Sequence, residues 1–582
     1  MSITLVLRSI VMATIVAGVA ACSTPQPDRA SMEAGSIVKV KLIAFNDFHG
    51  NLDAPKAVIR ARADASSTTK TGVDVPAGGI ARFATLVARL RAANPNNAVV
   101  SAGDMVGASP LVSALFLDEP TIEAMNRIGV DFSSVGNHEF DRGVDELRRK
   151  QFGGCERYVA SLAPCQAGHR FEGSKFQYLA ANVIDRATRQ PIFPAYAVKV
   201  FDGIKVGFIG LTLRGTDQLV DPTGIRSVVF EDEASTINRE ARILHDQGVN
   251  AIVVLIHEGG FTKGLLNDRT CPGLSGDILP ILDRLDPGVD VVASAHTHQP
   301  YVCTYRGILL TSAASYGRLV TDIDLDLDRR SGRVVRKEAT NRIVASEAFG
   351  DRPLQAGYPP VPVDPVMDAQ VDLYRTRVAP FANRKVGRIT ATLSKHEDVD
   401  GQSPLGDVIA DANLAATRQA GANIALLNAG SVRAPIEFSG DGTVTYCAAF
   451  QSQPFGNNLV TMTLTGRQIV AVLEQQWLPN RQEAQMLQVS RGFRYDYDMT
   501  RPIGSRVVTG SLRIDGQPIR PDASYRVTVN SFMASGGDGF VALFDGLDRV
   551  TGGIDVDALV AYFEARPVVE APDSGRVTKV PR

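Results

Sequence analysis

The chain has almost no excess of charge of either sign, because 61 lysines and arginines are balanced by 63 aspartates and glutamates. This balance excludes a general attraction to nucleic acid, so an anionic ligand must be held by a local group of charges. The sequence also lacks any Cys-x-x-Cys pair, which argues against a zinc–thiolate site. Its 582 residues contain no long low-complexity tract and are too many for one ordinary domain, so we expect two.

A hydrophobic run near the start of the chain is too short to cross a membrane. Arg8 precedes the apolar residues 10–19, and small residues follow up to Cys22, which is the order of an export signal. Residues 19–22, Val-Ala-Ala-Cys, resemble a bacterial lipobox. This resemblance implies that Cys22 is lipidated and becomes the mature N-terminus, and Ser23 favours the outer membrane by analogy. Plain secretion, with Cys22 incidental, is the alternative.

Export would place the remaining five cysteines in an oxidising compartment, where disulfides are permitted. Cys155 and Cys165 flank a short proline-containing loop and are the best candidate pair. Cys271 with Cys303 is a second, weaker candidate pair. We expect the odd residue, Cys447, to be a buried free thiol.

Apolar runs rich in valine and isoleucine recur through the first half of the chain, with helical patterns between several of them. The runs are Val38–Phe45, Ala98–Ser101, Val206–Leu211, Ala251–Ile256 and Val291–Ala295, and the helical patterns include residues 79–92 and 237–247. This alternation predicts an α/β layer with both sheet faces covered.

A polar, basic and then proline-containing stretch, followed by the helix-like Val366–Phe381, leads into a second α/β region. We therefore divide the chain into five parts. They are a signal peptide (1–21), a lipidated tether (22–35), a first domain (36–350), a linker with a connector helix (351–385) and a C-terminal domain (386–575).

Five short polar motifs each follow a predicted strand in the first domain. Their candidate ligand side chains are Asp47 and His49, Asp104, Asn137, His257, and His296 with His298. Because ligands bind outside the carboxyl ends of strands in α/β sheets, we expect these groups to meet at one edge. One such motif alone is usually a turn or a surface pair, so it is the conjunction of five that indicates a function.

Two divalent metal ions explain this choice of residue types. Phosphate esters hydrolyse extremely slowly without a catalyst, and two adjacent cations can clamp the ester and activate water. A bridging carboxylate holds two cations close together, while neutral imidazoles and an amide oxygen complete their shells without adding charge that repels phosphate. Such ligation suits Zn, Mn, Fe or similar ions and does not select among them.

The pattern D-x-H, G-D, G-N-H-E, H and H-x-H resembles that of the calcineurin-type metallophosphoesterases. With its C-terminal motifs, the chain resembles the bacterial 5′-nucleotidase/UDP-sugar hydrolase family from about residue 38 to residue 539. This resemblance implies a four-layer β-sandwich flanked by helices and a second α/β domain that binds the substrate.

The resemblance also implies roles for individual residues of the first domain. Asp104 would bridge two metal ions, and His138 would stabilise the transition state or protonate the leaving oxygen. Asp141 would orient and charge that imidazole. The further ligands would be Asp47, His49 and His298 for one ion, and Asn137, His257 and His296 for the other.

Three C-terminal motifs resemble the nucleotide-binding loops of the same family. They are N-x-G-x-x-R at residues 428–433, P-F-G-N at 454–457 and an aromatic, glycine-rich loop at 530–540. By resemblance, the substrate-binding residues are Asn428, Arg433 for phosphate, Phe455 and Phe532 around the base, Asn457, and Asp538 for the ribose. Core packing is the commoner fate of phenylalanine, but a position in a glycine-containing loop favours binding.

One segment departs from the family. Nucleotidases of this family commonly carry one or two further phosphate-binding arginines just upstream of a segment like residues 402–412, whereas this chain has Glu-Asp-Val-Asp-Gly at 397–401. Lys395 and His396 lie close by and are candidate substitutes. Without a second guanidinium the case for a monophosphate with two negative charges is weaker. Diesters, cyclic nucleotides and nucleotide sugars therefore remain candidate substrates.

The sequence thus indicates an exported dinuclear-metal hydrolase that removes phosphate from nucleotides. The alternatives are a cyclic-nucleotide or nucleotide phosphodiesterase, a UDP-sugar hydrolase and, from another class, a surface lipoprotein that binds nucleotides without turnover. We expect no nucleic-acid partner and membrane association through the lipid anchor only. If the domains behave as in the family, catalysis requires closure about a hinge near residues 360–390.

Overall fold

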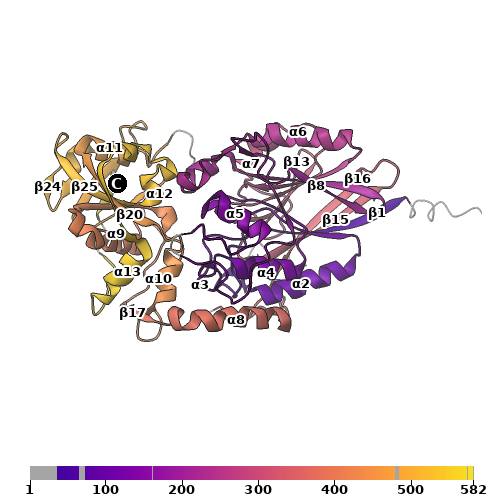
Figure 1. The fold of residues 1–582 in the computed structure, drawn as a ribbon, viewed down its shortest axis with the longest axis horizontal. Helices are drawn as coiled ribbons and strands as arrows, with labels where there is room; N and C mark the ends of the chain where they lie inside the picture. Colours follow the sequence, from indigo (N-terminus) through magenta and orange to yellow (C-terminus); the bar gives the residue numbers. More distant parts are fainter. Residues whose placement is uncertain are drawn as a thin grey trace, which may run out of the picture.

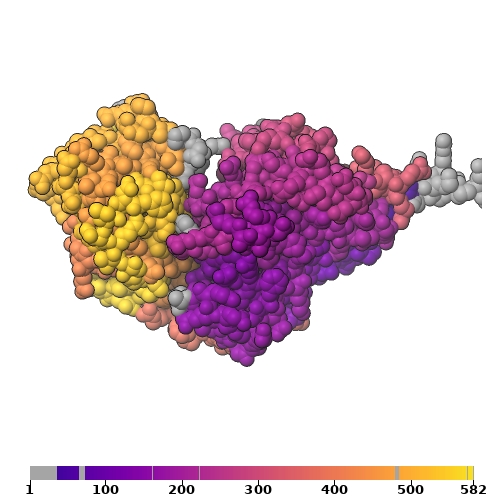
Figure 2. All heavy atoms as spheres, turned by 45° about the horizontal axis from the view of Figure 1, so that its top comes forward, coloured from indigo at the N-terminus to yellow at the C-terminus, as the bar shows by residue number. Residues whose placement is uncertain are grey.

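The computed structural model describes residues 36–63, 72–159, 162–350, 352–478, 484–572 and 575–580. The predicted signal peptide, Cys22 and the tether lie outside these residues. Two bodies lie side by side, the first coloured indigo to magenta and the second orange to yellow (Figure 1). The space-filling view shows them in contact along their common boundary (Figure 2). Within the described residues, no helix has both the length and the apolar character needed to span a bilayer.

The first body is built on two six-stranded sheets. The order across one sheet is β16 (Val334–Ile343), β15 (Leu319–Asp328), β1 (Ile37–Phe45), β4 (Asn97–Ser101), β5 (Phe132–Ser134) and β6 (Gln177–Leu179). The order across the other is β13 (Pro300–Tyr305), β14 (Ile308–Ala313), β12 (Val291–Ser294), β11 (Ala251–His257), β9 (Ile204–Thr212) and β8 (Tyr196–Phe201). The apolar runs predicted as strands all lie in these sheets.

The two sheets face each other across an apolar core, and helices cover their outer faces. Alternate residues of β1 show why: Val40 and Leu42 point into the core between the sheets, whereas Ile43 packs with the helices outside. The flanking helices are α2 (Ile80–Ala93), α3 (Leu111–Ala114), α4 (Glu119–Ile128) and α5 (Gly143–Phe152) on one side, and α6 (Glu233–Asp246) and α7 (Ile278–Asp283) on the other. The predicted four-layer arrangement is confirmed.

The strand pair β15 and β16 was not predicted. Aspartates alternate with apolar residues along β15, and the intervening residues Ile323, Leu325 and Leu327 are buried in the core between the sheets. Lys41 of β1 binds the Asp322 carboxylate on the opposite face of the sheet, so this charge is compensated.

The second body contains a five-stranded and a four-stranded sheet. The first has the order β21 (Leu487–Val489), β18 (Ile424–Asn428), β25 (Ser524–Asn530), β20 (Asn458–Thr465) and β26 (Leu547–Ile554), and the second β24 (Gln517–Pro518), β23 (Arg513–Ile514), β22 (Phe493–Asp498) and β27 (Val577–Val580). The main helices are α9 (Pro404–Thr417), α10 (Tyr446–Ser452), α11 (Gly466–Glu474) and α13 (Asp555–Glu564). A second α/β domain is therefore confirmed.

Helix α8 (Pro365–Ala382) occupies the predicted connector position and runs along the first body toward the second (Figure 1). The Asp364 carboxylate caps it by accepting two backbone N–H groups, and Pro365 occupies the first turn. Its buried residues Met367, Val371 and Tyr374 recur at helical spacing and belong to the core that contains α2 and α4.

Both candidate disulfides are formed, Cys155–Cys165 and Cys271–Cys303. The first closes the loop after α5, and the second ties the segment before α7 to β13. Cys447 is a free thiol as predicted, although it is only partly buried.

We expect Arg576 to be essential to the stability of the second body. Its guanidinium donates to both carboxylate oxygens of Asp411, at 2.8 and 2.9 Å, and to the Val489 carbonyl at 2.7 Å, and the residue is 6% exposed. Arg576→Met removes the buried counter-charge of Asp411 and should lower the free energy of unfolding by about 3 kcal/mol.

Thermal denaturation of the purified variant measures this change. The matched control is Arg491→Met, because Arg491 lies 3.8 Å from the same carboxylate but its side chain is 79% exposed. The control should shift stability by no more than about 0.5 kcal/mol. Equal effects of the two substitutions would contradict the expectation.

Candidate active site

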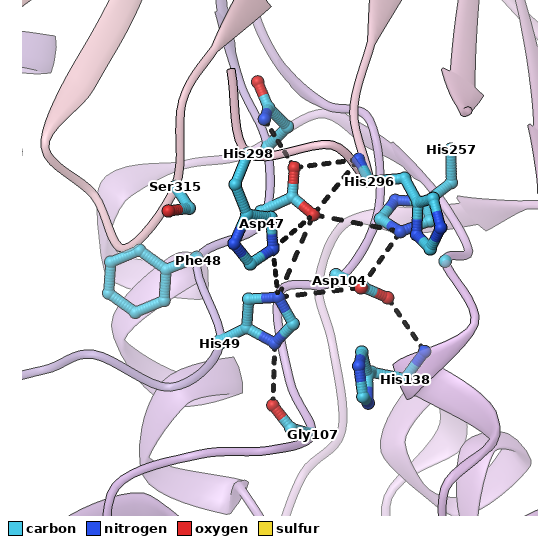
Figure 3. Close-up of polar contacts among 12 residues, drawn as sticks. Asp47, Phe48, His49, Asp104, Gly107, His138, His257, His296, His298 and Ser315 are labelled. Carbon is cyan, nitrogen blue, oxygen red and sulfur yellow. Dashed lines mark hydrogen bonds and ion pairs between the residues drawn. The ribbon is translucent and has the colours of Figure 1, made fainter. Parts of the chain in front are cut away.

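The candidate ligands come together where strands of the two sheets end. Asp47 and His49 follow β1, Asp104 follows β4, and Asn137 follows β5; His257 ends β11, and His296 and His298 follow β12. Figure 3 shows the Asp and His members of this set pointing toward one another from the two halves of the sandwich. The sequence-based expectation that these motifs meet is therefore confirmed.

Asp104 lies at the centre of this cluster. One of its carboxylate oxygens, Oδ2, is 2.9 Å from Nε2 of His257 and 3.6 Å from Nε2 of His49. The other, Oδ1, accepts the backbone N–H of His138 at 2.8 Å. A carboxylate reached by imidazoles of both sheets has the position that a bridging ligand requires.

Asp47 is the second carboxylate of the cluster. Its Oδ1 is 3.3 Å from Nε2 of His298 and 3.8 Å from Nε2 of both His49 and His257. The side-chain amide of Asn46 donates to its Oδ2 at 2.6 Å, and the backbone N–H of His296 approaches within 3.2 Å. These donors orient the carboxylate toward the imidazoles (Figure 3).

Backbone carbonyls set the orientation of two of the imidazoles. Nδ1 of His49 is 2.9 Å from the Gly107 carbonyl, and Nδ1 of His257 is 2.9 Å from the Ala102 carbonyl. A carbonyl can only accept, so each Nδ1 is assigned as the protonated donor. Each Nε2 then faces the carboxylates, which is the side on which a histidine ligand meets a metal ion.

The chemistry of the donor set fits divalent cations. Ligand atoms lie within 4.8 Å of one another in three groups: Asp47, His49 and His298; His49, Asp104 and His138; and Asp104, His257 and His296. Oδ1 of the buried Asn137 has no hydrogen-bond partner in the described structure, so this oxygen is available to a cation. The first group has the three residues that the resemblance implies for one ion, and the third combines Asp104 with His257 and His296, two of the three implied for the other.

Burial and the neighbouring charges shift the pKa values of the imidazoles in different directions. Burial acts to lower the pKa of His257, but the Asp104 carboxylate outweighs it and raises the pKa to about 10, so a cation bound there would have to displace a proton from this ring. Burial lowers the pKa of His49 and brings that of His296 to about 4, so both imidazoles are neutral at neutral pH. Burial acts to raise the pKa of Asp104, but the surrounding imidazoles, His257 foremost, outweigh it and hold the carboxyl well below its usual range.

Glu139 holds the site together, and the sequence analysis did not assign it a role. Its carboxylate accepts the backbone N–H groups of Asp104 at 2.8 Å, Met105 at 2.9 Å and Gly136 at 2.6 Å. It therefore fixes the loop after β4 against the loop after β5. Burial raises its pKa to about 7. The signal was present in the sequence, because Glu139 is the last residue of the G-N-H-E motif.

Glycines allow these two loops to approach each other so closely. A Cβ atom on Gly136 would lie 2.6 Å from the backbone nitrogen of Asp104, and one on Gly103 would lie 2.7 Å from the backbone nitrogen of Gly136. Neither position tolerates a side chain without moving a candidate ligand.

Five of the candidate ligands have left-handed backbone conformations. Their φ angles are 48° for Asp47, 48° for His49, 51° for Asp104, 68° for His296 and 57° for His298. This region costs a residue with a Cβ atom about 1–2 kcal/mol, somewhat less for aspartate. Such strain is concentrated at functional sites. Here the left-handed turns after β1 and β12 each direct two side chains toward the site.

His138 and Asp141 are paired as predicted. Nδ1 of His138 is 2.9 Å from Oδ2 and 3.0 Å from Oδ1 of Asp141. Burial acts to lower the pKa of this imidazole, but the carboxylates of Asp141 and Asp104 outweigh it, and the net shift is upward.

The second body contacts this catalytic candidate directly. The ring of Phe455 stacks on that of His138, with centroids 5.9 Å apart and an interplanar angle of 14°. The Arg433 guanidinium lies 5.8 Å from the centroid of the same phenyl ring. Two of the predicted substrate-binding residues therefore adjoin the metal-ligand cluster in this structure.

The other predicted substrate-binding residues form a connected group in the second body. Asn428 donates to Asp538 at 2.7 Å and accepts from Ser431 and from Asn530. Ser531, which precedes Phe532, donates to Asn457 at 3.4 Å, so the two aromatic loops are linked. The phenyl ring of Phe532 lies on Gly537, where a Cβ atom would collide with it.

Tyr316 also lies in the site and was missed. Its ring centroid is 5.8 Å from that of His49 and 5.4 Å from that of His298, and the Arg318 guanidinium lies 5.4 Å from the same ring. Its backbone N–H donates to the Asp47 carbonyl at 2.7 Å. An aromatic residue before a glycine, just after a strand, is the only signal that the sequence offered.

Known protein families match both bodies. The family described as calcineurin-like phosphoesterase matches residues 40–300, and the one described as 5′-nucleotidase, C-terminal domain, matches residues 385–545. The cell wall protein Lmo0130 of Listeria monocytogenes is 31% identical over 575 residues, which cover 95% of this chain and 71% of that protein. The chain belongs to the 5′-nucleotidase family of calcineurin-like phosphoesterases. Its members are phosphoric ester hydrolases that use divalent metal ions.

Two further relatives show how far the likeness extends. Endonuclease YhcR of Bacillus subtilis is 31% identical over 530 residues, which cover 91% of this chain but only 40% of that relative's length. The crystal structure of a 5′-nucleotidase precursor from Thermus thermophilus has 28% sequence identity and a TM-score of 0.72, covering 94% of this chain and 100% of that one. Both domains and their order are therefore shared with a solved nucleotidase structure.

The left-handed backbone at His298 leads to a prediction about stability. His298→Gly and His298→Ala remove the same imidazole and differ only in the Cβ atom. Because φ is 57°, we expect the glycine variant to be more stable by about 1 kcal/mol in metal-free thermal denaturation.

The control pair is His245→Gly and His245→Ala, because His245 lies in the last turn of helix α6 and has no left-handed backbone. There the order should reverse, with glycine less stable by about 1 kcal/mol. The same order of stability in both pairs would refute the role assigned to backbone strain.

Proposed function

We propose that the chain is an exported, dinuclear-metal hydrolase that removes phosphate from nucleotides, as a 5′-nucleotidase does. The observation that carries this proposal is the direct contact between the two halves of the site. The His138 ring, beside the ligand cluster, stacks on Phe455 of the domain that would hold the nucleotide.

Two ligand sets would hold the cations in this proposal. Asp104 would belong to both sets, with Asp47, His49 and His298 in one and Asn137, His257 and His296 in the other. Two divalent cations at these sets would neutralise charge on the phosphate and lower the pKa of a water molecule. The identity of the ions is open, since imidazole and carboxylate oxygen suit Zn, Mn and similar metals.

His138 would act on the leaving oxygen of the substrate, either by donating a proton or by stabilising charge there. Asp141 holds Nδ1 at 2.9 Å, so the proton available to a substrate is the one on Nε2. Arg433 would bind a phosphate oxygen as a guanidinium. Phe455 and Phe532 would hold the base, while Asn428, Asn457 and Asp538 would bind the rest of the nucleoside.

The place of action is part of the proposal. A signal peptide at residues 1–21 and lipidation of Cys22 would attach the protein to the cell envelope, and the lipobox analogy favours the outer membrane. The name of the Listeria relative, a cell wall protein, supports export. We also propose domain limits at 36–350 and 386–575, a linker at 351–385 and closure about a hinge near residues 360–390.

The runner-up is a diester or nucleotide-sugar hydrolase. The name of the Bacillus relative, an endonuclease, supports diester cleavage, and so does the missing upstream arginine. A nucleotide-binding lipoprotein without turnover is the third candidate, but a pure binder needs neither a paired His138 and Asp141 nor a complete ligand set.

The first test removes the metals and the bridging ligand. Phosphate release from AMP in the presence of Mn or Zn should be lost on chelation with EDTA and restored by added metal. Asp104→Asn should lower it by at least about 100-fold, because a neutral amide cannot bridge two cations.

The control is Asp145→Asn, whose side chain is 69% exposed on α5 and which should leave the rate unchanged. Phosphate release from AMP that persists after chelation and in the Asp104→Asn variant would refute the proposal. Nucleotide binding without any turnover at saturating metal would favour the binding lipoprotein instead.

The second test concerns the aromatic contact across the domains. Phe455→Leu should lower kcat/KM for AMP by about 5-fold to 100-fold, since stacking of a base on an aromatic ring contributes about 1–3 kcal/mol. Hydrolysis of glycerol phosphate, which has no base, should change little.

Phe438→Leu provides the control, because Phe438 is a 45% exposed phenylalanine of the same domain. An equal loss on AMP and glycerol phosphate would show that Phe455 supports His138 and does not select the base.

A further inference from the structure

The Tyr316 ring packs edge-on against two imidazoles of one candidate ligand set. Its centroid lies 5.8 Å from that of His49, at an interplanar angle of 62°, and 5.4 Å from that of His298, at an angle of 77°. Both histidines belong to the same group of candidate ligands. Within the described residues, no such ring contact joins Tyr316 to His257 or His296 of the other set. The contact therefore acts on one half of the cluster.

His298 is the imidazole that this contact constrains most. Backbone carbonyls hold Nδ1 of His49 and Nδ1 of His257, whereas in the described part of the chain no hydrogen bond reaches Nδ1 of His298. The His298 side chain is also 27% exposed, against 1% for His49 and 0% for His257. A histidine ligand is normally oriented through its second ring nitrogen. Without a protein partner there, the orientation of the His298 ring depends on the rings packed against it.

The turn that carries Tyr316 is tied to the loop that carries Asp47. The Tyr316 backbone N–H donates to the Asp47 carbonyl at 2.7 Å. The Asn46 side chain accepts the N–H of Ala313 and donates to the carbonyl of Ala314, both at 2.7 Å. Tyr316 thus keeps a fixed position relative to the ligands that follow β1.

Arg318 holds the Tyr316 ring by a cation–π contact. Its guanidinium lies 5.4 Å from the ring centroid. The same guanidinium donates to the Ser315 carbonyl at 3.0 Å, to the Ser315 hydroxyl at 2.8 Å and to the Val58 carbonyl at 3.0 Å. Among the described residues no carboxylate pairs with it. The hydrogen bonds therefore fix the cation, and the cation in turn fixes the ring.

We propose that Tyr316 is a positioning residue for one of the two metal ions, the ion that would bind to Asp47, His49 and His298. This inference rests on the proposed function and specifies how one of its two ligand sets is kept in order. Loss of the ring would free the His298 imidazole to rotate, while the set that contains His257 and His296 would keep its orientation.

Metal binding by the full chain tests this asymmetry without any turnover. Titration calorimetry of Mn into the chelator-treated protein should show two ions bound to the unaltered chain. Removing a group that orients a metal ligand lowers metal affinity about 10-fold to 100-fold. We therefore expect Tyr316→Leu to weaken one ion by that factor and to leave the other within about twofold. Tyr316→Phe keeps the ring and should retain both ions.

Electron paramagnetic resonance checks the same change, because a lone Mn ion and a pair of coupled Mn ions give different spectra. At the Mn concentration that fills both sites of the unaltered chain, Tyr316→Leu should give the spectrum of the lone ion. The matched control is Tyr305→Leu, since Tyr305 is a partly buried tyrosine of β13 whose hydroxyl binds Asp283. The control should keep the spectrum of the pair.

A purely structural role for Tyr316 predicts a different result. Equal weakening of both ions in Tyr316→Leu, unchanged binding of both, or a loss in Tyr316→Phe as large as in Tyr316→Leu would each overturn the proposal. If Tyr316→Leu does not fold, Arg318→Lys carries the test, because it keeps the charge but loses the fork of donors to Ser315 and Val58. Arg318→Lys should weaken one ion alone, and equal affinities for both ions would overturn the proposal.

The same titration separates this inference from the proposed function. Two ions bound without phosphate release from any monoester would refute the nucleotidase proposal and leave the role of Tyr316 intact. Phosphate release together with two ions that Tyr316→Leu retains would refute the role of Tyr316 alone. Fewer than two ions in the unaltered chain would refute both.

Discussion

The carboxylate of Glu139 is the interaction on which the site depends. It satisfies three backbone N–H groups at once, two from the loop that carries Asp104 and one from the loop that leads to Asn137. A buried N–H without a hydrogen-bond partner is costly in free energy. The two loops can therefore approach each other as closely as they do at Gly103 and Gly136 only because an acceptor lies between them. Every carboxylate–imidazole distance around Asp104 follows from that arrangement.

In the proposed function, the two bodies divide the recognition of a substrate between them. The first supplies the metal-ligand cluster and His138; the second supplies Arg433, Phe455 and the loops around Asp538. The stacking of Phe455 on His138 joins the two sets, so the group that would act on the leaving oxygen is positioned partly by the group that would hold the base. Helix α8 anchors on the first body, where Arg375 binds Asp53 at 2.5 Å, and leads the chain into the second.

Much of this arrangement could be predicted from local patterns. Asp-x-His and His-x-His motifs after strands place His49 and His298 at one edge of the sandwich, because sheet topology is regular. The directions of these side chains come from left-handed turns that were not predicted. What escaped prediction depends on partners distant in sequence. Glu139 looked like one more acidic residue, because its partners Asp104 and Met105 lie in a different loop.

The left-handed turns at the candidate ligands set stability and function against each other. Five candidate ligands have a backbone conformation that glycine or asparagine adopts at a lower cost in free energy. They are Asp47, His49, Asp104, His296 and His298. A laboratory screen that rewarded heat resistance alone would therefore accumulate replacements at these very positions. Directed evolution of this scaffold would have to select for turnover in every round, or the fold would improve while its chemistry disappeared.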